Sequence, residues 1–449
     1  MGRTITGLTA LLAVGLTSVA SAATPYPAPG KPSVKGAPKG PFHTLTVGKH
    51  GKYKTIQAAV DAAKPGDTVK LANGVYKEGV LVAGQAKRYL KIVGNVADPS
   101  KVVLEGKGLV GKELKRAGVP FVTNQDGVMV SNADQVTVKG MTAQHYKGNG
   151  FFFVNVNGYV ADHLNAFNVG TYGIYAFNSI GGTMSNDTGA WNNDSGFYIG
   201  QTPPQSKPVR SIVTNVTSYG NVLGFSGTNM RYVTIEHSKF FNNGTGIVPN
   251  ALHSERFAPP EDNVITDNDV FWNNFNYYVG APFRVNAHNK DSTPYPVGVG
   301  ILLFGSRTTQ VTNNRVYGNW LGGAGMIKQL LLTQEPAAQD LIGNSFTNNQ
   351  FGKNGTDLNG RDLVYDGNGQ NNCFSGNTGV QVTSPADPSI FAPCPFTGAN
   401  LFSAAGEAAM VGWALDDNHE ENWIKHDHAP QTGLVPLEEY KTYTGKKAP

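Results

Sequence analysis

Charged residues and amphipathic helical segments are both scarce in this 449-residue sequence. Only 15% of the residues are charged, whereas 40% are hydrophobic and 55 are glycine. A turn-rich composition with few helix formers favours β-structure over a helical fold. The formal net charge is +4, and the chain has no basic run of the kind that forms a nucleic-acid-binding arm. The composition therefore indicates a globular β-protein that does not bind nucleic acid.

Long hydrophobic runs are also absent, apart from one short stretch near the N-terminus. Arg3 precedes the apolar segment LTALLAVGLTSV, and the small residues ASA follow at positions 20–22. This pattern is typical of a secretory signal peptide, and the run is too short for a membrane span. We therefore expect residues 1–22 to be removed and the mature protein, beginning at Ala23, to be secreted.

Cysteine is nearly absent, since the chain contains only Cys373 and Cys394. In an exported protein two cysteines are expected to form one disulfide, and a catalytic thiol is the alternative. The disulfide would close a loop of about 20 residues and stabilise the fold by roughly 3 kcal/mol on the chain-entropy estimate.

A repeat of 22 to 23 residues is the strongest pattern in the sequence. Gly150, Gly173 and Gly196 begin the short apolar runs GFFFV, GIYAF and GFYIG at intervals of 23 residues. Alternating strand-like runs dominate after one amphipathic helical segment within 53–82, and no helical pattern separates them. A propeller blade would need about 40 residues per repeat. The spacing therefore predicts an all-β, right-handed parallel β-helix, a single-stranded solenoid with an N-terminal capping helix.

Further along the chain, an aromatic residue followed two positions later by asparagine marks each period. In a solenoid equivalent side chains lie about 4.8 Å apart, so stacked asparagines can bond the amides of adjacent coils. We expect a structural asparagine ladder formed by Asn193, Asn221, Asn243 and Asn274.

Four segments follow from these patterns. Residues 1–22 form the signal peptide, and the Pro-, Gly- and Lys-rich residues 23–41 form a disordered linker. Residues 42–395 form the β-helix, and residues 396–449 form a C-terminal extension that packs on the solenoid or trails from it.

The segment TIQAAVDAAKPGDTVKLANGVYKEGVLV, at 55–82, resembles the N-terminal cap and first coil of secreted pectin-lyase-like proteins. The later coils resemble the repeats of that superfamily, and NNCFSGNTG with the later APC resembles its C-terminal disulfide region. The resemblance covers residues 42–395 and implies the fold, together with activity on polysaccharides. The motifs of galacturonan hydrolases, pectin methylesterases and mannuronan epimerases are missing, so no catalytic residue is carried over.

Extra residues in the repeat indicate where a site would lie. Relative to a 22-residue coil, insertions occur at 201–210, 251–262 and 281–296, and each is expected to follow the equivalent strand. Insertions at one strand end of a solenoid build a wall, and the adjoining strand face becomes the floor of a groove. Such a groove suits a chain-like ligand, and an acidic polysaccharide is the expected partner of a monomeric protein.

These insertions and the ends of the neighbouring coils carry the candidate catalytic residues. Abstraction of the C5 proton of a uronic acid needs a base and a cation that stabilises the developing charge. The leading hypothesis is therefore a lyase-type enzyme, with the catalytic residues His253, Arg256, Tyr198 and Glu255. Substrate would be bound by Arg284, His288, Lys147 and His145. No cofactor is required by the pattern, although calcium is compatible with oxygen ligands of this kind.

Three alternatives remain open at this stage. The groove could bind a glycan or a surface without catalysis. It could be a glycoside hydrolase with two carboxylates about 5 to 9.5 Å apart, drawn from the following residues: Asp194, Glu236, Glu255, Glu261 and Asp262. The third alternative is an extracellular metal-binding protein that uses His419, His426 and His428.

Overall fold

The computed structural model describes residues 36–253, 255–277, 295–329, 336–353, 355, 357–415 and 433–436. The predicted signal peptide, most of the predicted linker and the histidine-rich segment 416–428 lie outside the described residues.

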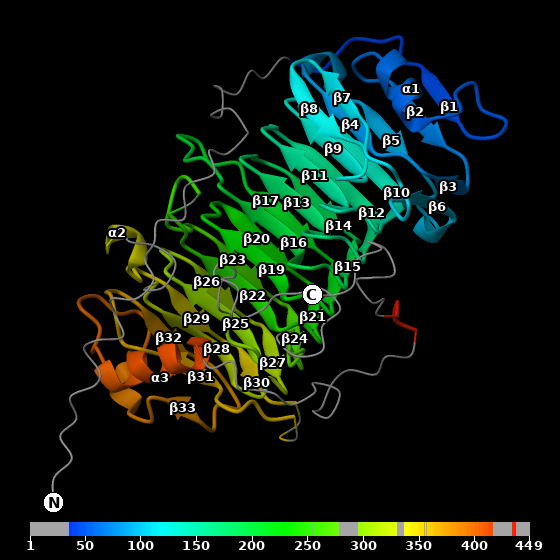
Figure 1. Cartoon of the computed structure of the whole chain (residues 1–449). Helices are drawn as coiled ribbons and strands as arrows, with labels where there is room; N and C mark the ends of the chain where they lie inside the picture. Colours follow the sequence, from blue (N-terminus) through cyan, green and yellow to red (C-terminus); the bar gives the residue numbers. More distant parts are fainter. Residues whose placement is uncertain are drawn as a thin grey trace, which may run out of the picture.

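The described residues fold into a right-handed parallel β-helix whose coils stack along one axis (Figure 1). Each full coil contributes one strand to each of three faces, and every strand pair between coils is parallel. The long strands β10 (Val136–Gln144) and β12 (Tyr159–Phe167) run through faces 1 and 2 without interruption. The prediction of a parallel β-helix is confirmed.

Face 1 contains the first halves of β10 and β12 and these strands: β1 (Thr44–Val47), β2 (Thr68–Leu71), β5 (Lys91–Val93), β14 (Thr183–Ser185), β17 (Ser211–Thr214), β20 (Val233–Glu236), β23 (Val264–Thr266), β26 (Gln310–Thr312), β29 (Ser345–Thr347) and β32 (Cys373–Ser375). Face 2 contains the second halves of β10 and β12 and these strands: β3 (Gly74–Tyr76), β6 (Val102–Glu105), β15 (Thr188–Ala190), β18 (Thr217–Tyr219), β21 (Lys239–Phe241), β24 (Asp269–Phe271), β27 (Arg315–Tyr317) and β30 (Gln350–Phe351).

Face 3 is a separate sheet of eleven strands: β4 (Val80–Ala83), β9 (Val128–Ser131), β11 (Phe151–Val154), β13 (Ile174–Phe177), β16 (Ser195–Gly200), β19 (Leu223–Thr228), β22 (Thr245–Asn250), β25 (Val299–Phe304), β28 (Gly322–Ile327), β31 (Leu363–Tyr365) and β33 (Thr383–Ser384). An antiparallel hairpin, β7 (Glu113–Arg116) and β8 (Val119–Val122), precedes β9. The helices are α1 (Ile56–Ala62), α2 (Pro336–Gln339) and α3 (Ala404–Leu415), with short 3-10 turns at Gln85–Lys87, Pro99–Lys101 and Pro388–Ile390.

The alternation of side chains explains why face 3 carries apolar residues on both sides. In β11, Phe151 and Phe153 point into the solenoid core, whereas Phe152 joins a cluster on the outer surface. The inner residues stack coil upon coil, as Phe151 pairs with Ile174 and Ile174 with Phe197. A glycine precedes each of these inner residues at the start of the run, which explains the 23-residue repeat of glycines in the sequence.

Buried asparagines line the corner between faces 2 and 3, but in a register that differs from the prediction. The ladder consists of Asn192, Asn221, Asn243, Asn273, Asn319 and Asn359. Asn243 Oδ1 accepts hydrogen bonds from the backbone and side-chain nitrogens of Asn221, at 3.1 and 3.0 Å. Each rung therefore satisfies a backbone amide that is buried at the corner.

Asn193 and Asn274 were predicted as rungs, and this prediction is wrong by one residue. Their side-chain amides donate instead to the carbonyls of Gly170 and Gly318. The stacked aromatics of the repeat are Tyr219, Phe241, Phe271 and Tyr317, with ring centroids 4.9 to 5.4 Å apart. Trp191 and Trp272 follow that position, in the left-handed region with φ of 57° and 49°. A tryptophan at this turn therefore imitates the aromatic position and shifts the apparent register by one.

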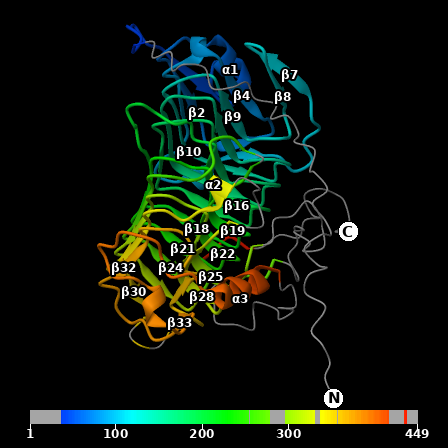
Figure 2. The same ribbon diagram turned by 90° about the vertical axis from the view of Figure 1, so that its left-hand side faces the viewer.

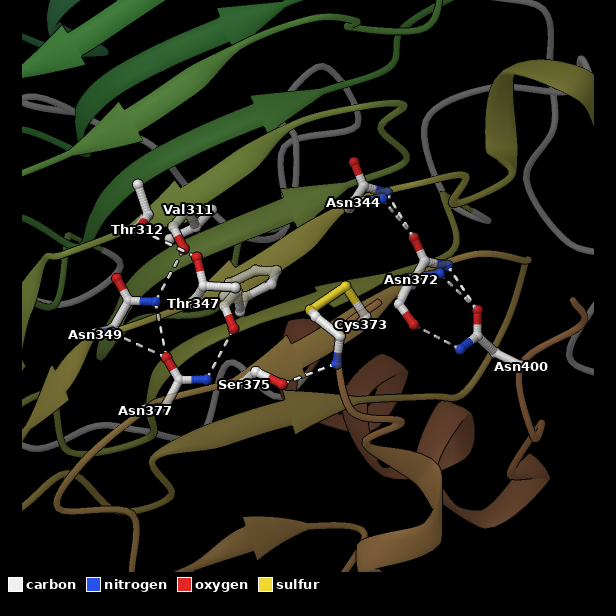
Figure 3. Close-up of a disulfide and its surroundings, with 12 residues drawn as sticks. Val311, Thr312, Asn344, Thr347, Asn349, Asn372, Cys373, Ser375, Asn377 and Asn400 are labelled. Atoms are coloured by element: carbon white, nitrogen blue, oxygen red, sulfur yellow. Dashed lines mark hydrogen bonds between the residues drawn. A yellow bond between two sulfur atoms is a disulfide. The ribbon is translucent and has the colours of Figure 1, made fainter. Parts of the chain in front are cut away.

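Figure 3 shows two further ladders near the C-terminal end of the solenoid, one through Asn344, Asn372 and Asn400 and one through Asn349 and Asn377. The predicted disulfide between Cys373 and Cys394 lies between them, with a Cα–Cα distance of 4.9 Å. Ser375 Oγ accepts a hydrogen bond of 2.8 Å from the backbone nitrogen of Cys394. The disulfide prediction is confirmed.

The C-terminal extension packs against the outer surface of face 3. Met410 of α3 joins an apolar cluster with Val299 and Val364 of that face. The guanidinium carbon of Arg361 lies 4.4 Å from the ring centroid of Trp413, which is also in α3. Figure 2 shows the hairpin β7–β8 and α3 toward opposite ends of the solenoid. Val435, which follows α3 in the sequence, accepts a hydrogen bond of 2.6 Å at its carbonyl from Trp191 Nε1. None of the helices in the described ranges is long and apolar enough to cross a membrane.

The ladder gives a first testable prediction. In Asn243→Ala the buried backbone nitrogen of Asn221 loses its acceptor, whereas the side-chain nitrogen keeps its bonds to Gly189 and Ser218, so we expect the free energy of unfolding to fall by about 2 kcal/mol. Asn193→Ala is the matched control, because that side chain donates one bond to Gly170 and is expected to cost less than about 1 kcal/mol. Equilibrium urea unfolding measures both, and equal losses would contradict the corrected register.

Candidate active site on the third face

Insertions border both edges of face 3. Residues 201–210 and 251–262 follow β16 and β22, at the edge shared with face 1, as predicted. The insertion at 281–296 was predicted to follow a strand as well, and this is wrong. The strand that pairs with β22 is β25, Val299–Phe304, so the inserted residues precede it and belong to the opposite edge. The described residues of this insertion, Tyr295 and Pro296, enter face 3 from the edge that it shares with face 2.

A cleft of about 640 Å³ lies between the hairpin β7–β8 and the outer surface of face 3. This volume falls within the range of roughly 300–1,000 Å³ that is usual for small-ligand sites. Its floor includes Met129, Phe152 and Tyr175, the second residues after the repeated glycines. The hairpin contributes Val119 and Phe121.

Aromatic rings line the floor toward the centre of the solenoid. Phe152 and Tyr175 are stacked with an interplanar angle of 2° and a centroid distance of 4.3 Å. The ring centroid of Tyr172 lies 4.6 Å from those of both Tyr175 and Tyr198, and the centroids of Tyr175 and Tyr198 are 4.8 Å apart. Tyr172 and Tyr175 are partly exposed and provide apolar area on which a sugar ring can stack, whereas Phe152 and Tyr198 are buried beside them.

Glu255 reaches this cluster from the insertion after β22. The phenol of Tyr198 donates a hydrogen bond of 2.5 Å to Glu255 Oε1. The side-chain amide of Asn229 fixes the loop by donating to the carbonyls of Leu252 and Glu255, at 2.7 and 2.9 Å. The backbone nitrogen of Arg256 donates to Gln201 Oε1 at 2.9 Å, which joins the two inserted loops. The carboxyl group is therefore held over the floor by several independent contacts.

Asp194 lies directly before β16 and belongs to the same site. Burial raises the pKa of Asp194 to about 7. Burial likewise raises the pKa of Glu255 to about 8, the hydrogen bond from Tyr198 acts in the opposite direction, and the nearby Asp194 carboxylate raises it further. Two largely buried carboxyl groups whose pKa values are raised to neutral pH and slightly above it are typical of an acid–base pair.

A third acidic group, Asp126, is among the residues that line the cleft. Burial raises the pKa of Asp126 to about 6, although the backbone and side-chain nitrogens of Asn149 both donate to its Oδ1. Asp126, Tyr172 and Tyr175 were not among the predicted site residues. Gly127 lies 23 residues before Gly150, so the glycine repeat would have identified Asp126 and Tyr172 as the residues preceding Gly127 and Gly173.

The other predicted catalytic and substrate-binding residues are distributed more widely. His253 and Arg256 are exposed on the loop that carries Glu255. Lys147 is exposed beside Gly148, which lines the cleft. His145 is buried, and its Nδ1 lies 2.8 Å from Glu105 Oε1 at the corner before β11. Arg284 and His288 lie outside the described residues.

The Glu105–His145 contact serves coil stacking. Burial raises the pKa of Glu105, but hydrogen bonds from His145 and Gln144 outweigh it and lower the pKa to about 2. The carboxylate therefore stays ionised, and the pair is not among the residues that line the cleft.

Of the five carboxylates considered for a hydrolase, the structure brings only Asp194 and Glu255 together on face 3. Glu236 ends β20 on face 1, and Glu261 forms an ion pair of 3.1 Å with Arg231. Asp262 accepts a hydrogen bond of 2.6 Å from Thr308. Across the part of the chain that the structure describes, no three His, Cys, Asp or Glu side chains are grouped as a metal site requires.

Several solved structures are similar to this chain. A mannuronan C-5 epimerase module from Azotobacter vinelandii is 16% identical, with a TM-score of 0.48 over 73% of this chain and 90% of its own. A rhamnogalacturonan lyase is 12% identical, with a TM-score of 0.43 and coverages of 68% and 87%. The catalytic domain of a GH87 alpha-1,3-glucanase in complex with nigerose is 13% identical, with a TM-score of 0.48 and coverages of 81% and 69%. No protein-family model and no curated protein match the sequence. Similarity at this level does not identify the activity, which must be argued from the site.

The raised pKa of Glu255 gives a second prediction. Its protonated form is favoured in the folded state, so its contribution to stability is complete below about pH 4.5 and is lost as the pH rises through about 8. We expect the Tm of the wild type to fall between pH 5 and pH 9 and that of Glu255→Gln to fall less. Glu236→Gln on face 1 should keep the wild-type slope. Parallel slopes for wild type and Glu255→Gln would contradict the assigned pKa.

Proposed function

We propose that the protein is a glycoside hydrolase that binds a glycan along face 3 and cleaves it between Asp194 and Glu255. The observation that carries this proposal is the pair of carboxyl groups whose pKa values are raised to about 7 and about 8. The aromatic floor and the adjoining cleft provide the surface on which sugar rings would lie.

Glu255 has the higher pKa and is the proton donor in this proposal. Tyr198 donates to its Oε1, and Oε2 is buried and has no hydrogen-bond partner among the described residues. The transferable proton is therefore on Oε2, from which it passes to the glycosidic oxygen as the bond to the anomeric carbon breaks. Tyr198 itself stays a neutral phenol, because burial and the Glu255 charge raise its pKa well above the ordinary value.

Asp194 supplies the base. In its ionised form it takes a proton from the water that adds to the anomeric carbon, or attacks that carbon directly. The two carboxyl groups come from different segments, one before β16 and one from the loop after β22. This arrangement suits a glycan that lies across β16 with one carboxyl group on each side.

The lyase hypothesis uses the same loop in a different way. Arg256 and His253 are both exposed beside Glu255, where a cation could meet a uronate carboxylate. The centre of the site, however, consists of acidic groups and phenols, and these favour a neutral glycan over an acidic one. The hydrolase is therefore the function that the geometry supports best.

A panel of neutral and acidic polysaccharides tests the proposal. Wild-type protein is expected to release reducing ends from a neutral glycan without absorbance of unsaturated uronate. Glu255→Gln and Asp194→Asn should each lower the rate by about 10²- to 10⁴-fold, because each removes one partner of the proton transfer. Glu236→Gln is the matched control and should retain the wild-type rate. Unsaturated products would establish the lyase, and retention of a polymer without cleavage would establish a binding protein.

The dependence of the rate on pH gives a further prediction. The rate should rise with pH as Asp194 ionises near pH 7 and fall as Glu255 ionises near pH 8. The apparent pKa values of the rising and falling limbs of this profile belong to the coupled pair and not to either residue alone. An aryl glycoside with a good leaving group needs no proton donor, so with this substrate Glu255→Gln should stay active and lose the falling limb. A falling limb that persists in this variant would assign the acid to another residue.

A further inference from the structure

We infer that the cleft is closed on one side of the Asp194–Glu255 pair by Tyr295, so that the enzyme acts on the ends of glycan chains. This inference rests on the proposed function and adds the mode of attack.

The side of the pair toward the N-terminus is open. Gln125, Gly148, Thr171 and Asp194 occupy equivalent positions in four successive coils, joined by backbone hydrogen bonds of 2.8 to 3.0 Å. The first three line the cleft, and Asp194 is the next position in the row. At about 4.8 Å per coil the row is roughly 14 Å long, enough for a short oligosaccharide that runs parallel to the solenoid axis.

The side of the pair toward the C-terminus is filled with apolar side chains. The row continues with Val222, because Ser195 pairs with Leu223 in the next coil, so that Val222 precedes Leu223 as Asp194 precedes Ser195. Val222 and Val248 belong to one buried cluster with Phe275 and Tyr277. Val248, on the outer side of β22, has no exposed surface.

Tyr295 crosses the floor at this point. Its neighbour Pro296 accepts a hydrogen bond of 2.7 Å from Thr245, the first residue of β22. The phenol of Tyr295 is bonded to the side chain of Asn250, the last residue of the same strand. Tyr277 Oη donates to the carbonyl of Tyr295 at 2.7 Å. Tyr295 and Pro296 together therefore contact both ends of β22, two coils beyond Tyr198.

Beyond Tyr295, α3 occupies the outer surface of β25, β28 and β31. The space between the helix and these strands is about 30 Å³ and is lined by apolar residues such as Leu302, Val364 and Met410. This is too small for a sugar unit. A glycan can thus extend from the acid–base pair in one direction, and its end lies against Tyr295.

The time course of hydrolysis tests this inference on wild-type protein. Mixed-linkage β-glucan and polygalacturonate serve as substrates, one neutral and one acidic. We expect reducing ends to appear while the viscosity stays high, with products that are short from the first time point. An early fall in viscosity with products of intermediate length would show that internal bonds are cut and would overturn the inference, while leaving the hydrolase proposal intact.

Binding stoichiometry separates the two proposals when no cleavage occurs. Size-fractionated samples of both polymers are titrated into Glu255→Gln, and the number of protein molecules bound per chain is measured. A closed cleft binds chain ends, so this number should not change with chain length. A number that rises in proportion to length would overturn the inference. No binding of either polymer would contradict the proposed function together with the inference.

Tyr295 variants identify the group that closes the cleft. Tyr295→Ala should raise the share of intermediate-length products several-fold. Tyr295→Phe keeps the ring but removes the hydroxyl that contacts Asn250, and it should still release short products. If Tyr295→Ala also produces only short products while remaining folded, Tyr295 is not the closing group. If the Ala variant fails to fold, the wild-type time course still decides the mode of attack.

Discussion

The structure depends on the hydrogen-bonded register between successive coils. Each strand of the solenoid pairs in parallel with the strands above and below it, and buried asparagines satisfy the amides at the corners where the chain turns. An unpaired amide inside the solenoid would cost free energy comparable to a lost hydrogen bond, so the corners tolerate few other residues. Because the register is fixed, residues that are one repeat apart in the sequence lie one strand spacing apart in space.

The candidate site is a direct product of this register. Met129, Phe152, Tyr175 and Tyr198 are spaced by 23 residues and therefore form one row on the outside of face 3. The row supplies a floor of one methionine and three aromatic side chains, whereas the acidic groups come from corners and insertions, where the repeat is interrupted. Rigid strands thus hold the floor, and the loop that carries Glu255 is fixed to them through Asn229 and Tyr198.

The repeat of glycines was sufficient to predict the fold, since 23-residue spacing without helices suits only a solenoid of short strands. The register of the asparagine ladder was missed at Asn192 and Asn273, because Trp191 and Trp272 occupy left-handed turn positions that elsewhere hold glycine or asparagine. Glu255 was predicted from the insertion after β22 and Tyr198 from the end of a neighbouring coil, and the structure joins them by a hydrogen bond. The pairing with Asp194 could not be predicted, because it depends on how far the loop after β22 reaches back over two coils. The edge to which the insertion before β25 belongs was also not predictable, since an alternating apolar sequence near Tyr277 imitates a strand.

The contact between Trp191 and Val435 joins residues that are 244 positions apart, whereas most other contacts connect neighbouring coils. Coils can form in order as the chain emerges, because each needs only the coil before it. The segment 433–436 cannot reach Trp191, three residues before Asp194, until nearly the whole chain is present. During synthesis, the surroundings of Asp194 and Glu255 are therefore completed last, and a chain that is truncated before this segment keeps its coils but lacks that contact.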